Sequence, residues 1–347
     1  MNTKVWIVDK SVENKNGYPQ LAEAAALLRQ KQTVAFPTET VYGLGADATS
    51  DEAVAKIFEA KGRPSDNPLI VHIASKEQLD SMAAYIPPVA ETLMEMFWPG
   101  PLTLLFPKKK SVSDKVTAGL STVAVRMPAH PLALALIRQA NVPVAAPSAN
   151  RSGRPSPTLA SHVYEDLNGR IPGIVDGGPT GIGVESTVLD CTGDIPVILR
   201  PGGITKEQLE AAVGQVLLDP ALKDETEVPK SPGMKYTHYA PKAPLTIVEG
   251  SREFLQDLVK QRKKEGLRVG VLTTEENQHF YEADVILPCG QRSDLATVAA
   301  QLYDVLRSFD DAGVDVIYSE AFPGEGIGIA IMNRLTKAAG HRSISEK

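Results

Sequence analysis

The sequence predicts an α/β protein with two domains, and three observations support this. The chain has 347 residues, more than one hydrophobic core usually serves. Short apolar runs alternate with helical patterns in both halves. Between the halves, residues 219–244 contain five prolines and no periodic apolar face, which indicates a linker. We therefore expect domains at 1–218 and 245–347, with 219–244 as a Pro-rich linker or lid.

Five short apolar runs of the first domain are typical of strands because Pro or polar residues bound each of them. They cover residues 33–41, 67–74, 102–107, 121–128 and 142–148. A further pair of apolar runs surrounds Thr-Gly-Asp within 185–203, which predicts a β-hairpin. The first domain should therefore contain a mixed sheet.

Three helices are expected between these strands. In residues 50–62 the apolar positions Val54, Ile57 and Phe58 recur at helical spacing. Ser50 or Asp51 can cap this helix, and Gly62 ends it. Residues 130–141 and 158–169 show the same kind of pattern and are predicted to be the other two helices.

The second domain alternates strands with helices. Strands are expected at 245–250, 268–274, 283–290 and 314–322, and helices at 252–264, at 294–310 and near Ile331. Apolar strands alternating with helices predict a small parallel sheet, Rossmann-like in outline. No G-x-G-x-x-G is present, so this pattern predicts no dinucleotide.

Charge and composition argue against several classes of protein. The net charge of −6 argues against a protein that holds nucleic acid by its whole surface. Cys191 and Cys289 lack C-x-x-C spacing, which argues against a zinc ribbon or a disulfide scaffold. The N-terminal residues lack the apolar core of a signal peptide, and no apolar run approaches the roughly 18 residues of a membrane span. We expect a soluble protein in the reducing cytoplasm.

The stretch KGRPSDNPLIVHI, residues 61–73, combines two cations, an Asn-Pro turn and a histidine in an apolar run. Lys61 and Arg63 stand at the end of the preceding helix, which should end near Ala60. They can complement its dipole and stay in solvent, or they can bind an anion; neither is expected in the core. Strand alternation places His72 on the same face as Ile70. It is either a core histidine or part of a pocket lining.

Three other segments carry candidate polar groups. FPTETVYGLGADA, residues 36–48, offers Thr38, Thr40 and a Gly-x-Gly pair that marks a tight turn or a close backbone approach. Arg126 ends an apolar strand and must find an anion, either a structural carboxylate or a ligand carboxylate. PSANRSGRPSPT, residues 147–158, has the composition of a loop that could hold phosphate or ribose, or of an ordinary loop.

Familiar catalytic signatures are absent. The sequence contains no G-x-x-x-x-G-K-[ST], no G-x-S-x-G, no H-E-x-x-H and no paired metal-ligand cluster. A bound nucleotide would therefore be held by side-chain cations and hydroxyls instead of a P-loop.

Taken in order, these motifs resemble the threonylcarbamoyl-AMP synthases of the two-domain Sua5 type. The resemblance also rests on GVESTVLD, ILRPGGI and the linker sequence SPGMKYTHYAPKAP, and it covers essentially the whole chain. It implies a YrdC-like twisted mixed sheet with helices, followed by a small Rossmann-like parallel α/β domain. It also implies a nucleotidyltransferase that joins L-threonine, bicarbonate or CO2, and ATP into L-threonylcarbamoyladenylate, with release of pyrophosphate.

The resemblance further implies partners and site residues. The product would pass to a tRNA threonylcarbamoyl transferase for the t6A37 modification of tRNA, and direct tRNA binding stays open. Lys61 and Arg63 would be catalytic, neutralising phosphate charge together with Mg2+ that enters with ATP. The L-threonine site would comprise Thr38, His72, Arg126, Ala146 and Ser186. The ATP site would comprise Lys61, Arg63, Asn67, Thr122, Ser148, Asn150, Ser156, Arg200, Tyr236 and His238.

Two alternatives remain. A related class uses the same fold to make carbamoyl adenylate, but those chains add an acylphosphatase-like domain and Cys-rich fingers that this sequence lacks. The other alternative is a module that binds double-stranded RNA, which the acidic balance disfavours.

Overall fold

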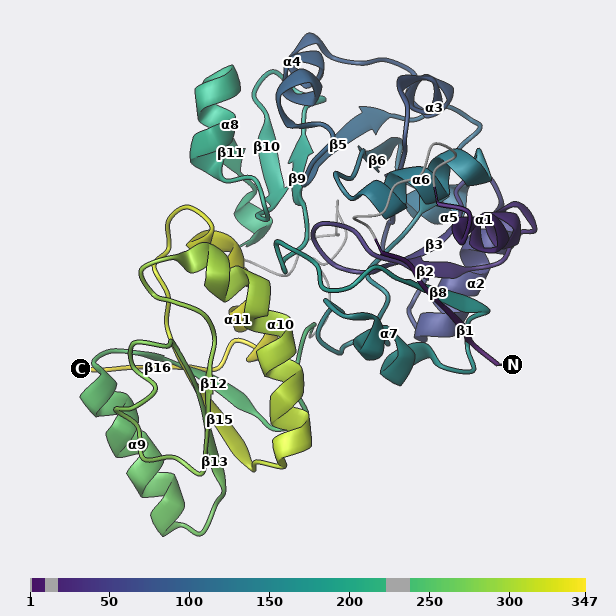
Figure 1. The fold of residues 1–347 in the computed structure, drawn as a ribbon. Coiled ribbons are helices and arrows are strands. Elements are labelled where there is room, and N and C mark those ends of the chain that lie inside the picture. Colours follow the sequence, from purple (N-terminus) through teal and green to yellow (C-terminus); the bar gives the residue numbers. More distant parts are fainter. Residues whose placement is uncertain (1, 10–17, 223–237) are drawn as a thin grey trace. The chain divides into compact units, whose positions relative to one another are not determined.

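The computed structural model describes residues 2–9, 18–222 and 238–347, and it divides into two compact units (Figure 1). The first unit holds the described chain up to residue 222, apart from two short segments. The second unit holds the chain from residue 238 onward together with those segments, Gly153–Pro155 and Ile182–Val184. Most of the expected linker falls outside the described residues.

The described strands of the first unit form one sheet in the order β1-β8-β2-β3-β7-β4-β6-β5-β9-β10-β11. Their bounds are β1 (Lys4–Ile7), β2 (Val34–Phe36), β3 (Gly43–Asp47), β4 (Ile70–His72), β5 (Leu102–Pro107), β6 (Thr122–Arg126), β7 (Val144–Ala145), β8 (Gly173–Asp176), β9 (Thr187–Asp190), β10 (Val197–Arg200) and β11 (Leu217–Leu218). The sheet is mixed, since β4 runs parallel to β6 whereas β5 runs antiparallel to β6.

Each of the five predicted runs contains an observed strand, and the predicted hairpin is the antiparallel pair β9 and β10. The tight-turn interpretation of the Gly-x-Gly pair is wrong, because Gly43 and Gly45 lie in β3. A close approach does occur at Gly45, but side chains approach it and not backbone. A Cβ at Gly45 would lie 2.7 Å from both Phe36 Cε1 and Val144 Cγ1.

The helices of the first unit pack around this sheet (Figure 1). Their bounds are α1 (Leu21–Arg29), α2 (Asp51–Lys61), α3 (Lys76–Met82), α4 (Pro88–Phe97), α5 (Asp114–Thr117), α6 (Pro131–Ala140), α7 (Ala160–Leu167) and α8 (Lys206–Val213), followed by the 3-10 turn η1 (Pro220–Leu222). The three predicted helices are α2, α6 and α7. The predicted start and end of α2 are also confirmed. The Ser50 side chain accepts from the Ala53 N–H, and Gly62 has a φ of +60°.

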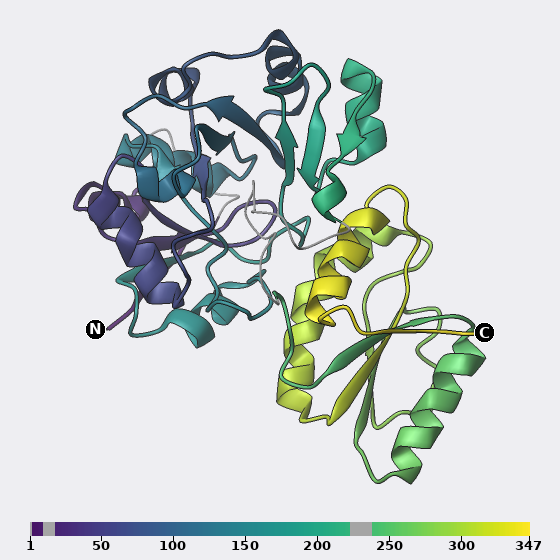
Figure 2. The same cartoon turned by 180° about the vertical axis from the view of Figure 1, so that it is seen from behind.

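The second unit is a small parallel α/β layer structure. Its elements are β12 (Leu245–Glu249), α9 (Arg252–Lys264), β13 (Val269–Thr273), β14 (Val285–Pro288), α10 (Leu295–Ala312), β15 (Val316–Glu320), α11 (Gly328–Ala338) and β16 (Ser343–Ser345). The strand order is β14-β13-β15-β12-β16, and all four pairings are parallel. Helix α9 covers one face of this sheet, and α10 and α11 cover the other (Figures 1 and 2). The predicted parallel sheet is confirmed.

Within the described ranges, every helix is too short or too polar to cross a lipid bilayer.

Candidate functional site

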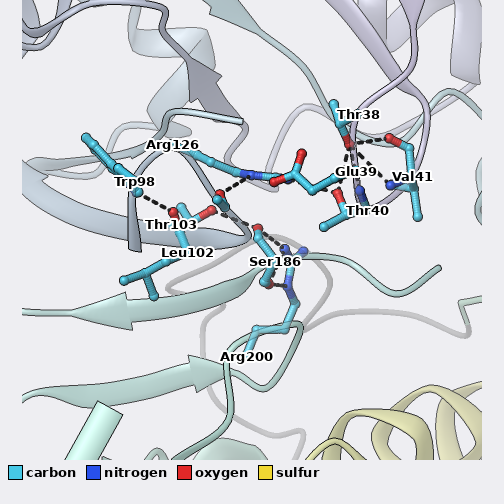
Figure 3. A network of polar contacts seen from close by, with 11 residues as sticks. Thr38, Glu39, Thr40, Val41, Trp98, Leu102, Thr103, Arg126, Ser186 and Arg200 are labelled. Carbon is cyan, nitrogen blue, oxygen red and sulfur yellow. Dashed lines mark hydrogen bonds and ion pairs between the residues drawn. The ribbon is translucent and has the colours of Figure 1, made fainter. Parts of the chain in front are cut away.

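Arg126 is the centre of one polar cluster (Figure 3). It ends β6 and is 3% exposed. Its Nε donates to the Gly100 carbonyl at 3.1 Å, and its Nη1 donates to Thr40 Oγ1 at 2.9 Å. Thr40 Oγ1 lies 2.9 Å from Thr38 Oγ1. The loop between β2 and β3 thus brings two hydroxyls to a buried guanidinium.

The anion that Arg126 requires is present in the chain itself. Glu39 Oε1 lies 2.6 Å from Arg126 Nη2, and the Glu39 side chain is 15% exposed. Sequence analysis left a structural carboxylate and a ligand carboxylate open, and the structure contains the first. Glu39 was missed, although it stands between Thr38 and Thr40 in the motif.

His72 ends β4 and pairs in register with Arg126 across the parallel β4–β6 ladder. It is 4% exposed, its ring meets Phe36 edge-on, and its Nδ1 has no hydrogen-bond partner within the described chain. Burial lowers the pKa of His72 to about 3, and the charge of Arg126 acts in the same direction. The imidazole is therefore a neutral, buried group beside a cation.

Ser186 and Arg200 form a second cluster (Figure 3). Ser186 precedes β9, and its Oγ lies 2.8 Å from Thr103 Oγ1. Arg200 ends β10 and donates from Nη2 to Ser186 Oγ at 3.1 Å and to the Ser186 carbonyl at 2.9 Å. The β9–β10 hairpin thus holds a buried guanidinium against a buried hydroxyl. Thr103 was missed; its signal is the single hydroxyl within the apolar run 102–107.

Lys61 joins the end of α2 to the loop after β7. Its Nζ donates to the Ser148 carbonyl at 2.5 Å and to the Asn150 carbonyl at 2.6 Å. Lys61 is 3% exposed, so the expectation that it lies outside the core is wrong. The reason is helical geometry: position 61 lies seven residues after Val54 and four after Ile57, on the same buried face.

The remaining candidates of the first unit are placed separately. Arg63 is half-buried, and its Nη2 lies 3.5 Å from the carbonyl of the buried Asn67. Ser156 Oγ donates to Glu185 Oε1 at 2.7 Å, and both residues are buried. Glu185 was also missed.

Two candidates continue strands of the sheet. The Ala146 N–H donates to the Ile70 carbonyl at 2.9 Å, and Thr122 begins β6.

The two linker candidates differ. Tyr236 lies outside the described residues. His238 is described and belongs to the second unit, where its ring lies 5.6 Å from that of Tyr239.

A mixed sheet that carries buried guanidinium, hydroxyl and neutral imidazole groups at its strand ends has the composition of an enzyme site for small anionic substrates. Comparisons with known proteins specify the family. A family model described as "Telomere recombination" matches residues 26–202. A model described as "Threonylcarbamoyl-AMP synthase, C-terminal domain" matches residues 204–340.

Known proteins are similar to this chain over nearly its full length. The chain is 63% identical to the threonylcarbamoyl-AMP synthase of Bacillus subtilis over 345 residues, covering 99% of this chain and 100% of the relative. It is 51% identical to that of Pyrococcus abyssi, with coverage of 92% and 94%. The crystal structure of P. abyssi Sua5 complexed with L-threonine matches with a TM-score of 0.93 at 48% identity, covering 99% of this chain and 100% of that chain. The chain belongs to the threonylcarbamoyl-AMP synthase family, and the predicted fold is confirmed.

Proposed function

We propose that the chain makes L-threonylcarbamoyl-AMP from L-threonine, bicarbonate or CO2, and ATP, and releases pyrophosphate. The observation that supports this proposal most strongly is the full-length similarity to threonylcarbamoyl-AMP synthases, together with a matching structure that is complexed with L-threonine. The product would serve the t6A37 modification of tRNA in the cytoplasm, after transfer to a tRNA threonylcarbamoyl transferase.

The chemistry joins two anions. The threonine amine adds to CO2 and loses a proton, which gives a carbamate. A carbamate oxygen then attacks the α-phosphorus of ATP, and the bond from that phosphorus to the bridging oxygen of the β-phosphate breaks, so that pyrophosphate leaves. Positioning and fixed positive charge supply most of the acceleration in such phosphoryl chemistry.

Threonine binding is assigned to the Arg126 cluster. The Arg126 guanidinium would take the substrate carboxylate, in a site whose hydroxyls come from Thr38 and Thr40. Neutral His72 adds a hydrogen-bonding nitrogen without adding charge, since its pKa is about 3. Ala146 and Ser186 would complete this side of the site.

ATP binding is assigned to cations and hydroxyls at the ends of α2 and β10 and in the loops after α2 and β7. Arg63 and Arg200 would neutralise phosphate charge, and Mg2+ would enter with the triphosphate. Lys61 would act through its own positive charge at the C-terminal end of α2 and through its hydrogen bonds to the Ser148 and Asn150 carbonyls. Asn67, Thr122, Ser156, Tyr236 and His238 are proposed contributors to the same site.

The direct test is pyrophosphate release from ATP with each amino acid in turn. A site that hydrogen-bonds the threonine hydroxyl rejects valine more strongly than a size difference alone would. We expect threonine to support release and both serine and valine to be poor substrates. Equal release with valine would refute the threonine assignment. RNA binding that needs neither ATP nor threonine, without pyrophosphate release, would favour the RNA-binding alternative.

A further inference from the structure

The second unit contains a cavity of about 510 Å³ at the carboxyl ends of β12 and β15. These two strands are neighbours, yet the helices that follow them, α9 and α11, lie on opposite faces of the sheet (Figures 1 and 2). Such a reversal is a topological switch point, where open parallel sheets bind their ligands. Polar lining residues include Ser251, Arg252, Asn277, Tyr281, Arg292 and Glu320.

The cavity floor is a satisfied network around Glu320, which is 7% exposed. Its Oε1 accepts from Tyr281 at 2.6 Å, from Thr273 Oγ1 at 2.8 Å and from Asn277 Nδ2 at 3.0 Å. Its Oε2 lies 3.2 Å from Arg292 Nη1. The network compensates the Glu320 charge and fixes Arg292, whose side chain is still 41% exposed.

The beginning of α9 already holds an anion that the chain supplies. The Ser251 N–H donates to Glu346 Oε2 at 2.6 Å, and the Ser251 hydroxyl donates to Glu346 Oε1 at 3.0 Å. A Cβ at Gly250 would lie 2.7 Å from Glu346 Oε2, so the glycine permits this close approach. Glu346 is exposed, so its carboxylate can turn into solvent without breaking a buried contact.

Arg252 is the second cation that lines the cavity. Its guanidinium lies over the Phe280 ring, 4.5 Å from the centroid, and its side chain is 51% exposed. Glu253 accepts from its Nε at 3.2 Å, and Glu249 also lines the cavity. The helix N-terminus, Arg252 and Arg292 supply several donors that the multiple oxygens of one phosphoryl group can share. The nearby carboxylates of Glu249, Glu253 and Glu320 limit the charge of the bound group.

We propose that this cavity binds a small phosphoryl-bearing ligand of about the size of a nucleoside monophosphate, whose phosphoryl group displaces Glu346 and contacts Arg252 and Arg292. The volume lies within the range of about 300 to 1,000 Å³ that small-molecule sites occupy. The cavity lies wholly within the second unit, so the proposal does not rest on the chemistry assigned to the first unit.

Hydrogen exchange of the full chain, followed by mass spectrometry, tests the proposal because it assigns protection to individual peptides. The probes are inorganic phosphate and AMP, with adenosine as the uncharged control. We expect AMP to protect peptides that cover 245–255 and 318–325. Protection by phosphate as well would show that the phosphoryl group suffices. Protection by AMP alone would show that the nucleoside part also contributes.

Variants make the test specific to this site. Glu346→Gln removes the competing charge and should lower the AMP concentration for half-protection by about two- to fivefold, the size of a charge effect at a helix terminus. Arg252→Gln should raise that concentration at least as much. Arg262→Gln, on the other end of α9, is the matched control and should change nothing. The proposal fails if neither probe protects these peptides, if adenosine protects them equally, or if Arg252→Gln leaves the concentration unchanged.

Discussion

At the scale of single residues, His72 links burial to pH dependence. Its pKa is lowered to about 3 in the folded protein, below its ordinary value of about 6.5 in the unfolded chain. Its contribution to stability is therefore complete above pH 6.5 and is lost as the pH falls from 6.5 towards 3.

We expect the free energy of unfolding of the wild type to fall by about 2 kcal/mol more than that of His72→Gln between pH 8 and pH 5. Urea unfolding of both proteins at the two pH values measures this difference. Equal losses would mean that His72 takes up a proton in the folded state and is not the neutral group described above.

Glu39 is expected to compete with threonine. Its carboxylate already lies 2.6 Å from Arg126 Nη2, so a substrate carboxylate must share or displace it. Glu39→Gln should tighten threonine binding by about three- to tenfold, because a neutral amide competes less well for a guanidinium. Calorimetric titration measures the affinity, and the surface variant Glu52→Gln is the control. Weaker binding would instead assign Glu39 to holding Arg126 in place.

At the scale of the element, α2 places the charged side chain of Lys61 among buried residues. Lys61 is buried and donates to two backbone carbonyls of the loop after β7, whereas Arg63 lies half-buried beyond the helix. Lys61→Ala should lower the free energy of unfolding by about 1 to 3 kcal/mol, because it leaves buried acceptors unmatched.

Arg63→Ala is the matched variant and should cost less stability. Both variants should lose most pyrophosphate release. Thermal unfolding combined with the activity assay separates the two effects. Equal stability of the two variants would contradict the structural role of Lys61.

Local signals explain which elements the sequence predicts. The cap at Ser50, the left-handed Gly62 and an apolar period define α2, and the same kind of pattern places α9 at residues 252–264 as observed. Strand β3 escaped prediction because its sequence, GLGAD, has the glycines of a turn. It is a strand because it pairs with β2 and β7, and glycine is needed at position 45 because Phe36 and Val144 leave no room for a Cβ.

At the scale of the whole molecule, long-range pairings decide what the sequence could not predict. Nothing local to Arg126 shows that Glu39, 87 positions earlier, supplies its carboxylate. The order of the large sheet is equally nonlocal, since β1 pairs with β8. The burial of Lys61, in contrast, was predictable from its seven-residue spacing to Val54. The family motifs predicted which residues are candidates, and the structure showed which of these residues lie together.

The chain also connects its two units by more than the linker. Gly153–Pro155 belongs to the second unit, although it follows Asn150 and precedes Ser156, two proposed ATP residues. Within that unit, Arg307 of α10 is 4% exposed and donates from Nη2 to the Pro155 carbonyl at 2.6 Å. The Ala240 N–H donates to the Gly153 carbonyl at 3.0 Å.

These bonds predict that a change in the second unit weakens nucleotide binding. Arg307→Ala should release the segment directly before Ser156 and reduce ATP affinity by up to about tenfold, an upper limit that corresponds to losing one hydrogen bond to a charged group. Threonine affinity should change little, because Arg126 and its partners lie in other segments. Calorimetric titration with each substrate measures both affinities, and Arg262→Ala on α9 is the control. An unchanged ATP affinity in a folded Arg307→Ala protein would show that the segment Gly153–Pro155 does not position Ser156.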